Sequence, residues 1–348
     1  MKAVIYTAPG EVSTTTAVTP SLGAGDVLIK VLSNTICGTD LRIAKGLKRK
    51  GVIAPRILGH EVAGVIEHVG SEVSDYQPGQ QVGMCPTYSC GTCRECERGR
   101  THLCSNALVL GHQSDGGLAE YILVPALGVT QGVIVAHSGT HAPEVISLAE
   151  PLSCVIHGQS FLSITPGDVV TVIGGGAIGL MHAQVAKLAG ASTVILSEPV
   201  EFRRTLASEF GADITVNPEV EDLDAIVREH SNGAGSDVVI VCIGVPALVN
   251  VAFSIAANRG RVSLFAGFPA DEASAIDANL VHYRELSVVG SSNSTVPDYH
   301  QAIDLIDSGK IPCHKLITHR FGLDDYALAV DTIPQPHALK VAILPHGE

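Results

Sequence analysis

The sequence predicts an α/β protein in which a doubly wound parallel sheet is inserted into an irregular β-rich domain. From Pro166 onward, short apolar β runs alternate with helix-like segments, and this order indicates a parallel sheet covered on both faces. Before residue 155, the β runs are short and are interrupted by Gly, Pro and Asn, as in an irregular β domain. The few elements after Gly290 cannot form a core alone, so we expect them to pack on the N-terminal domain.

The expected elements follow in chain order. The β-rich part should contain strands at Val27–Val31 and Val62–Val69. The inserted part has six candidate strands, at Val169–Ile173, Thr193–Ser197, Ile214–Val216, Val238–Cys242, Arg261–Phe265 and Leu286–Gly290. Helical periodicity predicts helices at Ala177–Leu188, Phe202–Phe210, Asp298–Asp307 and Asp324–Ile333, and strands are expected near His319–Phe321 and Val341–Leu344. The predicted domains are therefore 1–153 with 291–348, and 154–290.

The composition excludes several classes of protein. Lys and Arg total 22 and Asp and Glu total 35 in 348 residues, a formal net charge of −13, whereas binding to nucleic acid needs clustered cations. The absence of Trp and the 4% share of aromatic residues argue against a base-stacking surface. The N-terminus lacks the apolar region of a signal peptide, and the longest uncharged apolar run, Val169–Met181, is too short to span a membrane. We therefore expect a cytoplasmic protein without nucleic-acid or membrane partners.

A glycine-rich turn joins the first inserted strand to its helix. Gly174, Gly176 and Gly179 form the pattern G-x-G-x-x-G directly after that strand. The first glycine allows the tight turn, the second lets a pyrophosphate approach the backbone, and the third lets the helix pack closely on the strand. The helix starting at Ala177 and Ile178 would offer free amides and the positive end of its dipole to the phosphates. This context favours a dinucleotide site over a structural turn.

Glu198 ends the second inserted strand and indicates which dinucleotide is bound. A carboxylate at this position hydrogen-bonds the adenosine ribose and repels a 2′-phosphate, which favours NAD over NADP. Arg203 and Arg204 lie nearby in the sequence and could soften that preference. Small residues at the ends of later strands would let the nicotinamide lie close to the backbone. The further candidate coenzyme contacts are Cys242, Gly244, Ala266, Gly267, Ser291 and Asn293.

Four cysteines form a second pattern, Cys90, Cys93, Cys96 and Cys104, in a segment rich in Gly, Arg and Thr. Thiolates at these spacings can enclose one tetrahedral Zn²⁺, and four sulfur ligands leave no open position for a substrate. The alternatives are an iron–sulfur cluster, which also takes four thiolates, and a group of free thiols. Because little apolar material could order this segment, we predict a structural zinc site.

A second metal site is indicated more weakly. Cys37 follows one strand, His60 and Glu61 begin another, and Glu150 precedes the inserted domain. Thiolate, imidazole and carboxylate ligands would leave room for water or substrate, as a catalytic zinc requires. A single buried Cys or His is usually a structural residue, so the spacing alone does not decide between the two interpretations.

Taken together, the motifs resemble the zinc-dependent medium-chain dehydrogenases over nearly the whole chain. The resemblance rests on Ile36–Asp40, Leu58–Glu61 with Gly64, Asp115–Gly117 with Ala119–Tyr121, the four cysteines and the glycine turn. It implies a GroES-like catalytic domain with an inserted Rossmann domain, NAD as the coenzyme, and two Zn²⁺ per chain, one catalytic and one structural. We further expect a homo-oligomer, either a dimer or a tetramer.

The resemblance also implies roles for individual residues. Cys37 and His60 match zinc ligands, while Glu61 and Glu150 match acidic positions that bind the metal directly or through water in polyol dehydrogenases. Thr39 matches the hydroxyl residue that hydrogen-bonds the substrate oxygen. The implied reaction is the reversible oxidation of a secondary hydroxyl to a ketone, with hydride passing to NAD⁺ and the proton leaving through Thr39 or a water near the two glutamates.

The substrate implied by Glu150 is a polyol, a sugar acid or a sugar-alcohol phosphate. Two departures argue against sorbitol itself: Ser291–Asn293 replace an Arg–Tyr pair of sorbitol dehydrogenases, and Arg42 replaces a His. The segments Arg98–Cys104 and Ile317–Phe321 resemble threonine dehydrogenases, so an L-threonine 3-dehydrogenase or a 2,3-diol dehydrogenase is the alternative.

The sequence has one basic cluster, which lies between Cys37 and His60 and consists of Arg42, Lys45, Lys48, Arg49 and Lys50. It would suit a phosphate or carboxylate on the substrate, or it could form a solvated loop. Two other protein classes remain open. A metal-free quinone or enone reductase would need neither metal motif, and an NAD sensor with a vestigial site would need only the glycine turn.

Overall fold

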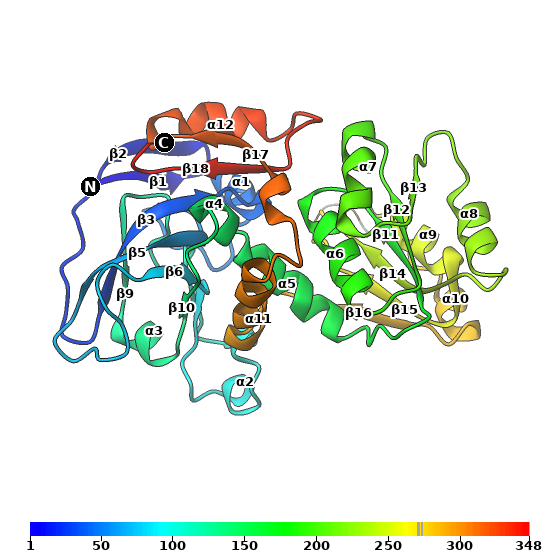
Figure 1. Cartoon of the computed structure of the whole chain (residues 1–348), viewed down its shortest axis with the longest axis horizontal. Coiled ribbons are helices and arrows are strands. Elements are labelled where there is room, and N and C mark those ends of the chain that lie inside the picture. The colour runs from blue at the N-terminus through cyan, green and yellow to red at the C-terminus, as the bar shows by residue number, and fades with distance from the viewer. Residues whose placement is uncertain (270–271, 273, 348) are drawn as a thin grey trace. The chain divides into compact units, whose positions relative to one another are not determined.

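The computed structural model describes residues 1–269, 272 and 274–347 (Figure 1). It divides into two compact units: unit 1 comprises Met1–Ser153 and Ser294–Glu348, and unit 2 comprises Cys154–Asn293. Helix α5 (Ala149–Ser160) carries the chain from unit 1 into unit 2. Over the described residues, we find no helix with both the length and the apolar character that crossing a membrane requires.

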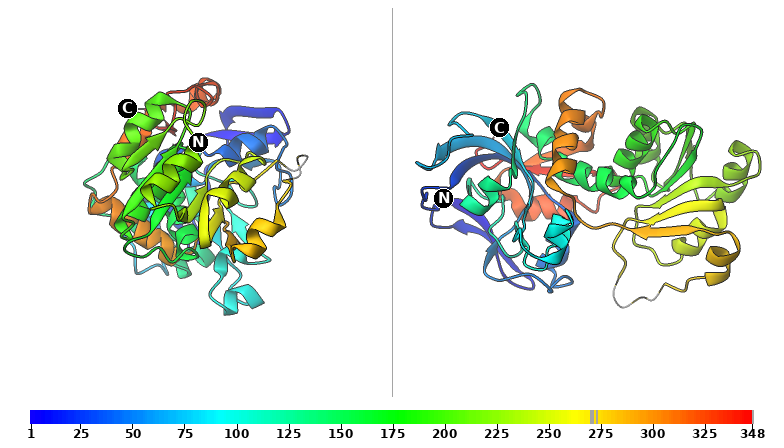
Figure 2. Two further views of the ribbon diagram at one scale, coloured as in Figure 1. Left: turned by 90° about the vertical axis from the view of Figure 1, so that its right-hand side faces the viewer. Right: turned by 90° about the horizontal axis from the view of Figure 1, so that it is seen from below.

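Unit 2 is built on a six-stranded parallel sheet in the order β13-β12-β11-β14-β15-β16. Its strands are β11 (Val169–Ile173), β12 (Thr193–Ser197), β13 (Ile214–Val216), β14 (Ser236–Val241), β15 (Ala256–Leu264) and β16 (Ser287–Gly290). Every residue of β11 is buried, because helices cover both faces of the sheet (Figure 2). The strand order reverses between β11 and β14, which is the point where doubly wound sheets bind nucleotides. The predicted Rossmann fold is thus confirmed.

The helices of unit 2 pack against this sheet or, in the case of α10, against a neighbouring helix. They are α6 (Ala177–Leu188), α7 (Glu201–Ala207), α8 (Leu223–His230), α9 (Leu248–Ile255) and α10 (Ala278–Tyr283). α6 packs on β11 and β12, and α9 packs on β14 and β15. Phe253 of α9 joins Val239 and Val241 of β14 in a single hydrophobic core. This two-sided burial explains why the strands are continuously apolar instead of alternating.

Unit 1 is mainly antiparallel. Its largest sheet has the order β10-β6-β5-β3-β18-β17 with β9 also paired to β3, and a smaller sheet has the order β2-β1-β4. The strands are β1 (Lys2–Ala8), β2 (Glu11–Thr16), β3 (Val27–Thr35), β4 (Arg56–Ile57), β5 (Glu61–Val69), β6 (Gln81–Met84), β7 (Thr87–Tyr88), β8 (Leu108–Val109), β9 (Tyr121–Val124), β10 (Ile134–Ala136), β17 (Ile317–Phe321) and β18 (Lys340–Ile343). The helices are α1 (Gly38–Ala44), α2 (Arg94–Glu97), α3 (Ala126–Thr130), α4 (Pro143–Ile146), α11 (Val296–Asp307) and α12 (Tyr326–Thr332).

The C-terminal elements complete the N-terminal sheet. β18 pairs antiparallel with β3, with Ala342 opposite Thr35, and parallel with β17. Tyr326 of α12 and Ile343 of β18 share a hydrophobic cluster with Val4 of β1. The expectation that these elements pack on the N-terminal part is therefore confirmed.

Some element bounds differ from the predicted ones. The helix predicted at Phe202–Phe210 is α7 followed by a 3₁₀ turn, Ser208–Phe210, which ends at Gly211 with a left-handed φ of 78°. β15 begins at Ala256, before the predicted Arg261, because Ala256 already pairs with Ser236 of β14. The earlier start of β15 arises from a pairing partner that the local sequence does not reveal.

Candidate active site and metal centres

The first candidate metal group consists of Cys37, His60 and Glu61, and one ligand atom of each lies within 4.8 Å of the others. Cys37 is the N-cap residue of α1, just after β3 ends at Thr35, while His60 and Glu61 stand at the start of β5. β3 and β5 pair antiparallel with Thr35 opposite Glu61, which brings two distant motifs together. Sulfur, imidazole nitrogen and carboxylate oxygen are the ligands that zinc takes in proteins, so the group fits this metal.

Asp40 orients the imidazole of His60. Its Oδ1 lies 3.3 Å from His60 Nδ1, and its Oδ2 accepts a hydrogen bond of 3.0 Å from the backbone N–H of Cys37. A carboxylate beside one ring nitrogen directs the other nitrogen towards a metal. Burial by itself would lower the pKa of His60, but the negative charges of Asp40 and Cys37 raise it well above its ordinary value. The pocket therefore stabilises positive charge, as a cation site must.

Glu61 is fully buried and is paired with a cation that the sequence did not single out. Lys340 Nζ donates to Glu61 Oε1 at 2.5 Å and to Oε2 at 2.6 Å, and Thr35 Oγ1 also donates to Oε2. Burial lowers the pKa of Lys340, but the charge of Glu61 outweighs this effect, and the net change is upward. Lys340 thus stays charged and balances Glu61. Lys340 and Thr35 together occupy both lone pairs of Oε2, whereas Oε1 keeps a further lone pair that could bind a metal.

Two other residues expected at this site lie outside the group. Glu150 is buried in the first turn of α5 but does not belong to the metal groups that the described residues form. Its charge still contributes to the raised pKa of Lys340, so it lies within electrostatic reach of the same pocket. Thr39 is half-buried, and its backbone N–H donates to Cys37 Sγ over 3.5 Å. The catalytic roles of Glu150 and Thr39 stay predictions.

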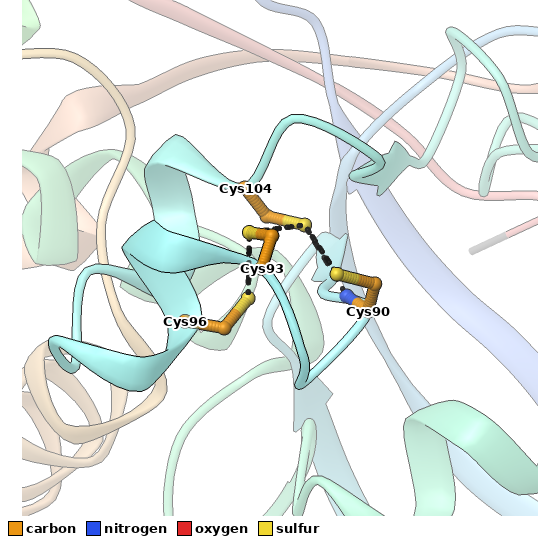
Figure 3. Close-up of side chains that lie close together, drawn as sticks. All are labelled: Cys90, Cys93, Cys96 and Cys104. Carbon is orange, nitrogen blue, oxygen red and sulfur yellow. Dashed lines mark hydrogen bonds between the residues drawn. The ribbon is translucent and has the colours of Figure 1, made fainter.

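The second candidate metal group is formed by Cys90, Cys93, Cys96 and Cys104, whose side chains point towards one another (Figure 3). The Sγ atoms of Cys90 and Cys104 are 3.4 Å apart, those of Cys93 and Cys104 are 3.8 Å apart, and those of Cys93 and Cys96 are 3.5 Å apart. In a tetrahedron with Zn–S bonds of about 2.3 Å the sulfur atoms would be about 3.8 Å apart. The four thiols therefore fit a single tetrahedral zinc.

The surroundings of this cysteine lobe also favour a metal. No residue of α2, the helix that carries Cys96, is buried, so the lobe has little apolar core of its own. Backbone N–H donors lower the pKa of Cys90 to about 5 and that of Cys93 to about 7, whereas burial raises the pKa of Cys104 to about 11. The thiolate is the form of cysteine that binds a metal, and the lowered pKa values favour this form at Cys90 and Cys93.

The glycine turn lies between β11 and α6. Gly174 has a φ of 103°, which side chains rarely tolerate. A Cβ at position 179 would lie 1.8 Å from the carbonyl oxygen of Gly174, so Gly179 permits the close packing of helix on strand. Gly176 is the N-cap of α6, and a Cβ there would meet nothing within 4 Å. The turn therefore has the geometry of a pyrophosphate site, with open space at its central glycine.

Glu198 lines a cavity of about 600 Å³ in unit 2, together with Gly174, Val200 and Arg203. Its Oε2 accepts a hydrogen bond of 2.7 Å from the backbone N–H of Gly175, and its Oε1 accepts one of 2.9 Å from that of Val200. Arg203 Nη1 lies 4.0 Å from Glu198 Oε2. The carboxylate is thus fixed beside the turn, and one cation is close enough to weaken its repulsion of a phosphate.

The remaining candidate coenzyme residues follow strands of the same sheet. They are Cys242 and Gly244 after β14, Ala266 and Gly267 after β15, and Ser291 and Asn293 after β16. A Cβ at position 244 would lie 2.3 Å from the carbonyl oxygen of Gly267, so these two loops pass very close to each other. Because the carboxyl ends of parallel strands share one edge, the loops lie along the same edge as the glycine turn.

A dinucleotide turn in one unit and a metal group with three protein ligands in the other are the two requirements of a metal-dependent dehydrogenase. Comparison with known proteins supports the same class of enzyme. Residues 23–133 match the alcohol dehydrogenase GroES-like domain, and residues 177–308 match the zinc-binding dehydrogenase domain. The L-threonine 3-dehydrogenase of Pyrococcus furiosus is 35% identical over 333 residues, which cover 93% of this chain and 92% of that protein. The chain belongs to the zinc-binding medium-chain alcohol dehydrogenase family and is an oxidoreductase.

Two solved structures are similar over the whole chain. A protein from Sinorhizobium meliloti 1021, described as a zinc-binding dehydrogenase and bound to NADP, has a TM-score of 0.91 and 36% identity, covering 99% of both chains. An alcohol dehydrogenase from E. coli CFT073 in complex with NADH has a TM-score of 0.89 and 30% identity, also covering 99% of both chains. These similarities confirm the predicted fold and family, and the two related proteins hold different coenzymes, NADP in one and NADH in the other.

Proposed function

We propose that this chain oxidises the secondary hydroxyl of a small substrate to the ketone, reversibly and with NAD⁺, and that L-threonine is the first substrate to test. Unit 1 would be the catalytic domain and unit 2 the NAD domain. The observation that carries the redox chemistry is the group of Cys37, His60 and Glu61 within 4.8 Å. The similarity to a threonine 3-dehydrogenase over 93% of the chain favours a 2-amino-3-hydroxy acid over a polyol. The expected dimer or tetramer stays a prediction.

The mechanism assigns separate tasks to the residues of the pocket. Zinc would supply Lewis-acid polarisation of the hydroxyl, and NAD⁺ would supply the hydride acceptor. Asp40 would hold His60 in its metal-binding orientation, and Lys340 would hold Glu61 in place and balance its charge. The hydroxyl of Thr39 would hydrogen-bond the substrate oxygen and relay its proton, taking up that proton while its own hydroxyl proton passes to solvent. The amides of the glycine turn would bind the pyrophosphate and so fix the coenzyme.

A panel of substrates tests this proposal. NADH formation is measured with L-threonine, 2,3-butanediol, sorbitol, galactonate and galactitol 1-phosphate, with ethanol as a simple alcohol for comparison. We expect the highest kcat/KM for L-threonine and negligible oxidation of ethanol. A polyol or sugar phosphate as the best substrate would restore the interpretation based on Glu150. Robust oxidation of ethanol would contradict both.

Replacing Glu150 by Ala is expected to lower kcat by about two to four decades, if this carboxylate moves a proton near the metal group. Binding of NAD⁺ should be retained, because the glycine turn is untouched. The measurements are steady-state kinetics, zinc content and the Kd for NADH. Glu150→Gln, which keeps the shape of the side chain, should lose a similar factor with the same melting temperature as wild type. A kcat within threefold of wild type in Glu150→Ala would exclude the role.

Replacing Glu198 by Ala is expected to increase the use of NADP⁺ relative to NAD⁺ by tens of fold, on the order of 2 kcal/mol at about 1.4 kcal/mol per decade. The substitution removes the charge that would repel a 2′-phosphate and leaves Arg203 in the cavity wall. The readout is the ratio of kcat/KM for the two coenzymes. Glu201→Ala removes the same charge from an exposed position at the start of α7 and should leave the ratio unchanged. Equal use of both coenzymes by the wild-type enzyme would refute the proposed selectivity.

A further inference from the structure

Lys48 differs from the other members of the basic cluster. Arg42, Lys45, Arg49 and Lys50 are exposed, whereas Lys48 is half-buried in the segment that follows α1. Its backbone N–H donates to the carbonyl oxygen of Arg42 at 3.1 Å, which folds this segment back over the end of the helix. Burying an ammonium group is costly unless an anion lies nearby. The position of Lys48 is therefore one at which a counter-ion would be stabilised.

No residue of the described part of the chain forms an ion pair with Lys48. Burial lowers the pKa of its ammonium group, and the charges of Cys37 and Asp40 act in the opposite direction. The side chain thus lies within electrostatic reach of the first metal group, but no protein carboxylate takes up its charge. Lys340, another cation near this metal group, is by contrast paired with both carboxylate oxygens of Glu61.

His112 supplies a second polar group without a partner in the same place. The segment after Lys48 is tied to it, since the backbone N–H of Ile53 donates to the carbonyl oxygen of His112 at 3.0 Å. The ring of His112 is 8% exposed and lies 5.8 Å, centroid to centroid, from the ring of His60. Its buried Nε2 has no hydrogen-bond partner among the described residues. Gln113 Nε2 also donates to the carbonyl oxygen of Gly51, so the segment that follows Lys48 is tied at two points to the segment of His112.

We propose that Lys48, with His112 beside it, binds the anionic group of the substrate while the substrate hydroxyl lies at the group of Cys37, His60 and Glu61. A charge-assisted hydrogen bond to a carboxylate or phosphate would satisfy the unpaired ammonium. The enzyme would then select anionic secondary alcohols, such as hydroxy acids, over neutral ones. This inference rests on the proposed function, because it assigns a substrate class to the same site.

The test compares Lys48→Met with Lys45→Met, which removes the same charge from an exposed position of the same segment. Two matched pairs of ligands are used, L-threonine with L-threoninamide and galactitol 1-phosphate with galactitol, in which only the first member carries a carboxylate or phosphate. Lys48→Met should raise KM for the member with the anionic group in one pair by about 10- to 100-fold, the usual loss for a hydrogen bond to a charged group. Its kcat should change much less, because the proposal assigns Lys48 to the anionic group and not to the reacting hydroxyl, and the member without that group should not bind more weakly than to wild type. Lys45→Met should behave as wild type.

Titration calorimetry of the zinc-loaded enzyme with the same four compounds separates this inference from the proposed function. A selective loss of L-threonine binding identifies a carboxylate, and a selective loss of galactitol 1-phosphate binding identifies a phosphate, whether or not either compound is oxidised. Threonine oxidation with an unchanged KM in Lys48→Met would overturn the inference and leave the proposed function standing. Equal weakening of both members of each pair, or wild-type enzyme that binds neither ligand with an anionic group, would also overturn it.

Discussion

Replacing His60 by Ala should abolish the catalytic zinc site, with zinc content falling from two ions per chain to one and kcat falling by about three decades or more. Three decades correspond to about 4 kcal/mol of transition-state stabilisation, within the range expected for Lewis-acid activation of a hydroxyl. His60 is one of three ligands within 4.8 Å, and its removal leaves only Cys37 and Glu61. Zinc is measured by atomic emission, and turnover is followed as NADH formation.

A graded variant shows whether the loss comes from the metal site or from misfolding. Asp40→Asn keeps the imidazole but removes the charge that lies 3.3 Å from its Nδ1. It should weaken zinc binding by about 10- to 100-fold, as measured by chelator competition, since partners of metal ligands have effects of that size. Added zinc should then restore turnover in Asp40→Asn but not in His60→Ala. Two zinc ions per chain and undiminished turnover in His60→Ala would show that the group is not the catalytic centre.

The second large effect is expected at the cysteine lobe. Replacing Cys96 by Ser should remove one zinc ion per chain and lower the melting temperature, because the binding energy of a structural zinc, about 10–16 kcal/mol in small zinc domains, is also folding energy. No residue of α2 is buried, so little other than the metal orders this segment. Limited proteolysis should cut the lobe rapidly in the variant and slowly in the wild-type enzyme.

Cys154→Ser is the matched control for this second prediction. Cys154 is a half-buried thiol outside both metal groups, so its replacement should leave two zinc ions per chain and a slow cleavage of the lobe. The coenzyme affinity of Cys96→Ser should also match wild type, since the glycine turn belongs to unit 2. Unchanged zinc content in Cys96→Ser would refute the lobe as a metal site, and an iron–sulfur cluster would appear instead as iron and visible absorption.

Local patterns were sufficient for the parts of this protein whose chemistry depends on neighbours in the chain. The strand Val169–Ile173, the helix Ala177–Leu188 and the turn between them form with the predicted bounds, because apolar periodicity and glycine geometry are local properties. The four cysteines converge because three of them lie within seven consecutive positions of one short segment. Resemblance to the dehydrogenase family then supplied the roles of Cys37 and His60, for which spacing alone was not decisive.

Only the tertiary structure reveals the contacts between residues that lie far apart in the sequence. Lys340 neutralises Glu61 because β18 pairs with β3, and no pattern around position 340 indicates that partner. The segment after Lys48 is hydrogen-bonded to that of His112, and burial singles out Lys48 among five basic residues that the sequence could not tell apart. By itself the sequence determined the class of fold, the glycine turn and the four cysteines as a candidate metal group. Charge balance and the unpaired cation of the pocket depend on long-range packing, because Coulomb energies are set by distance and burial and not by order along the chain.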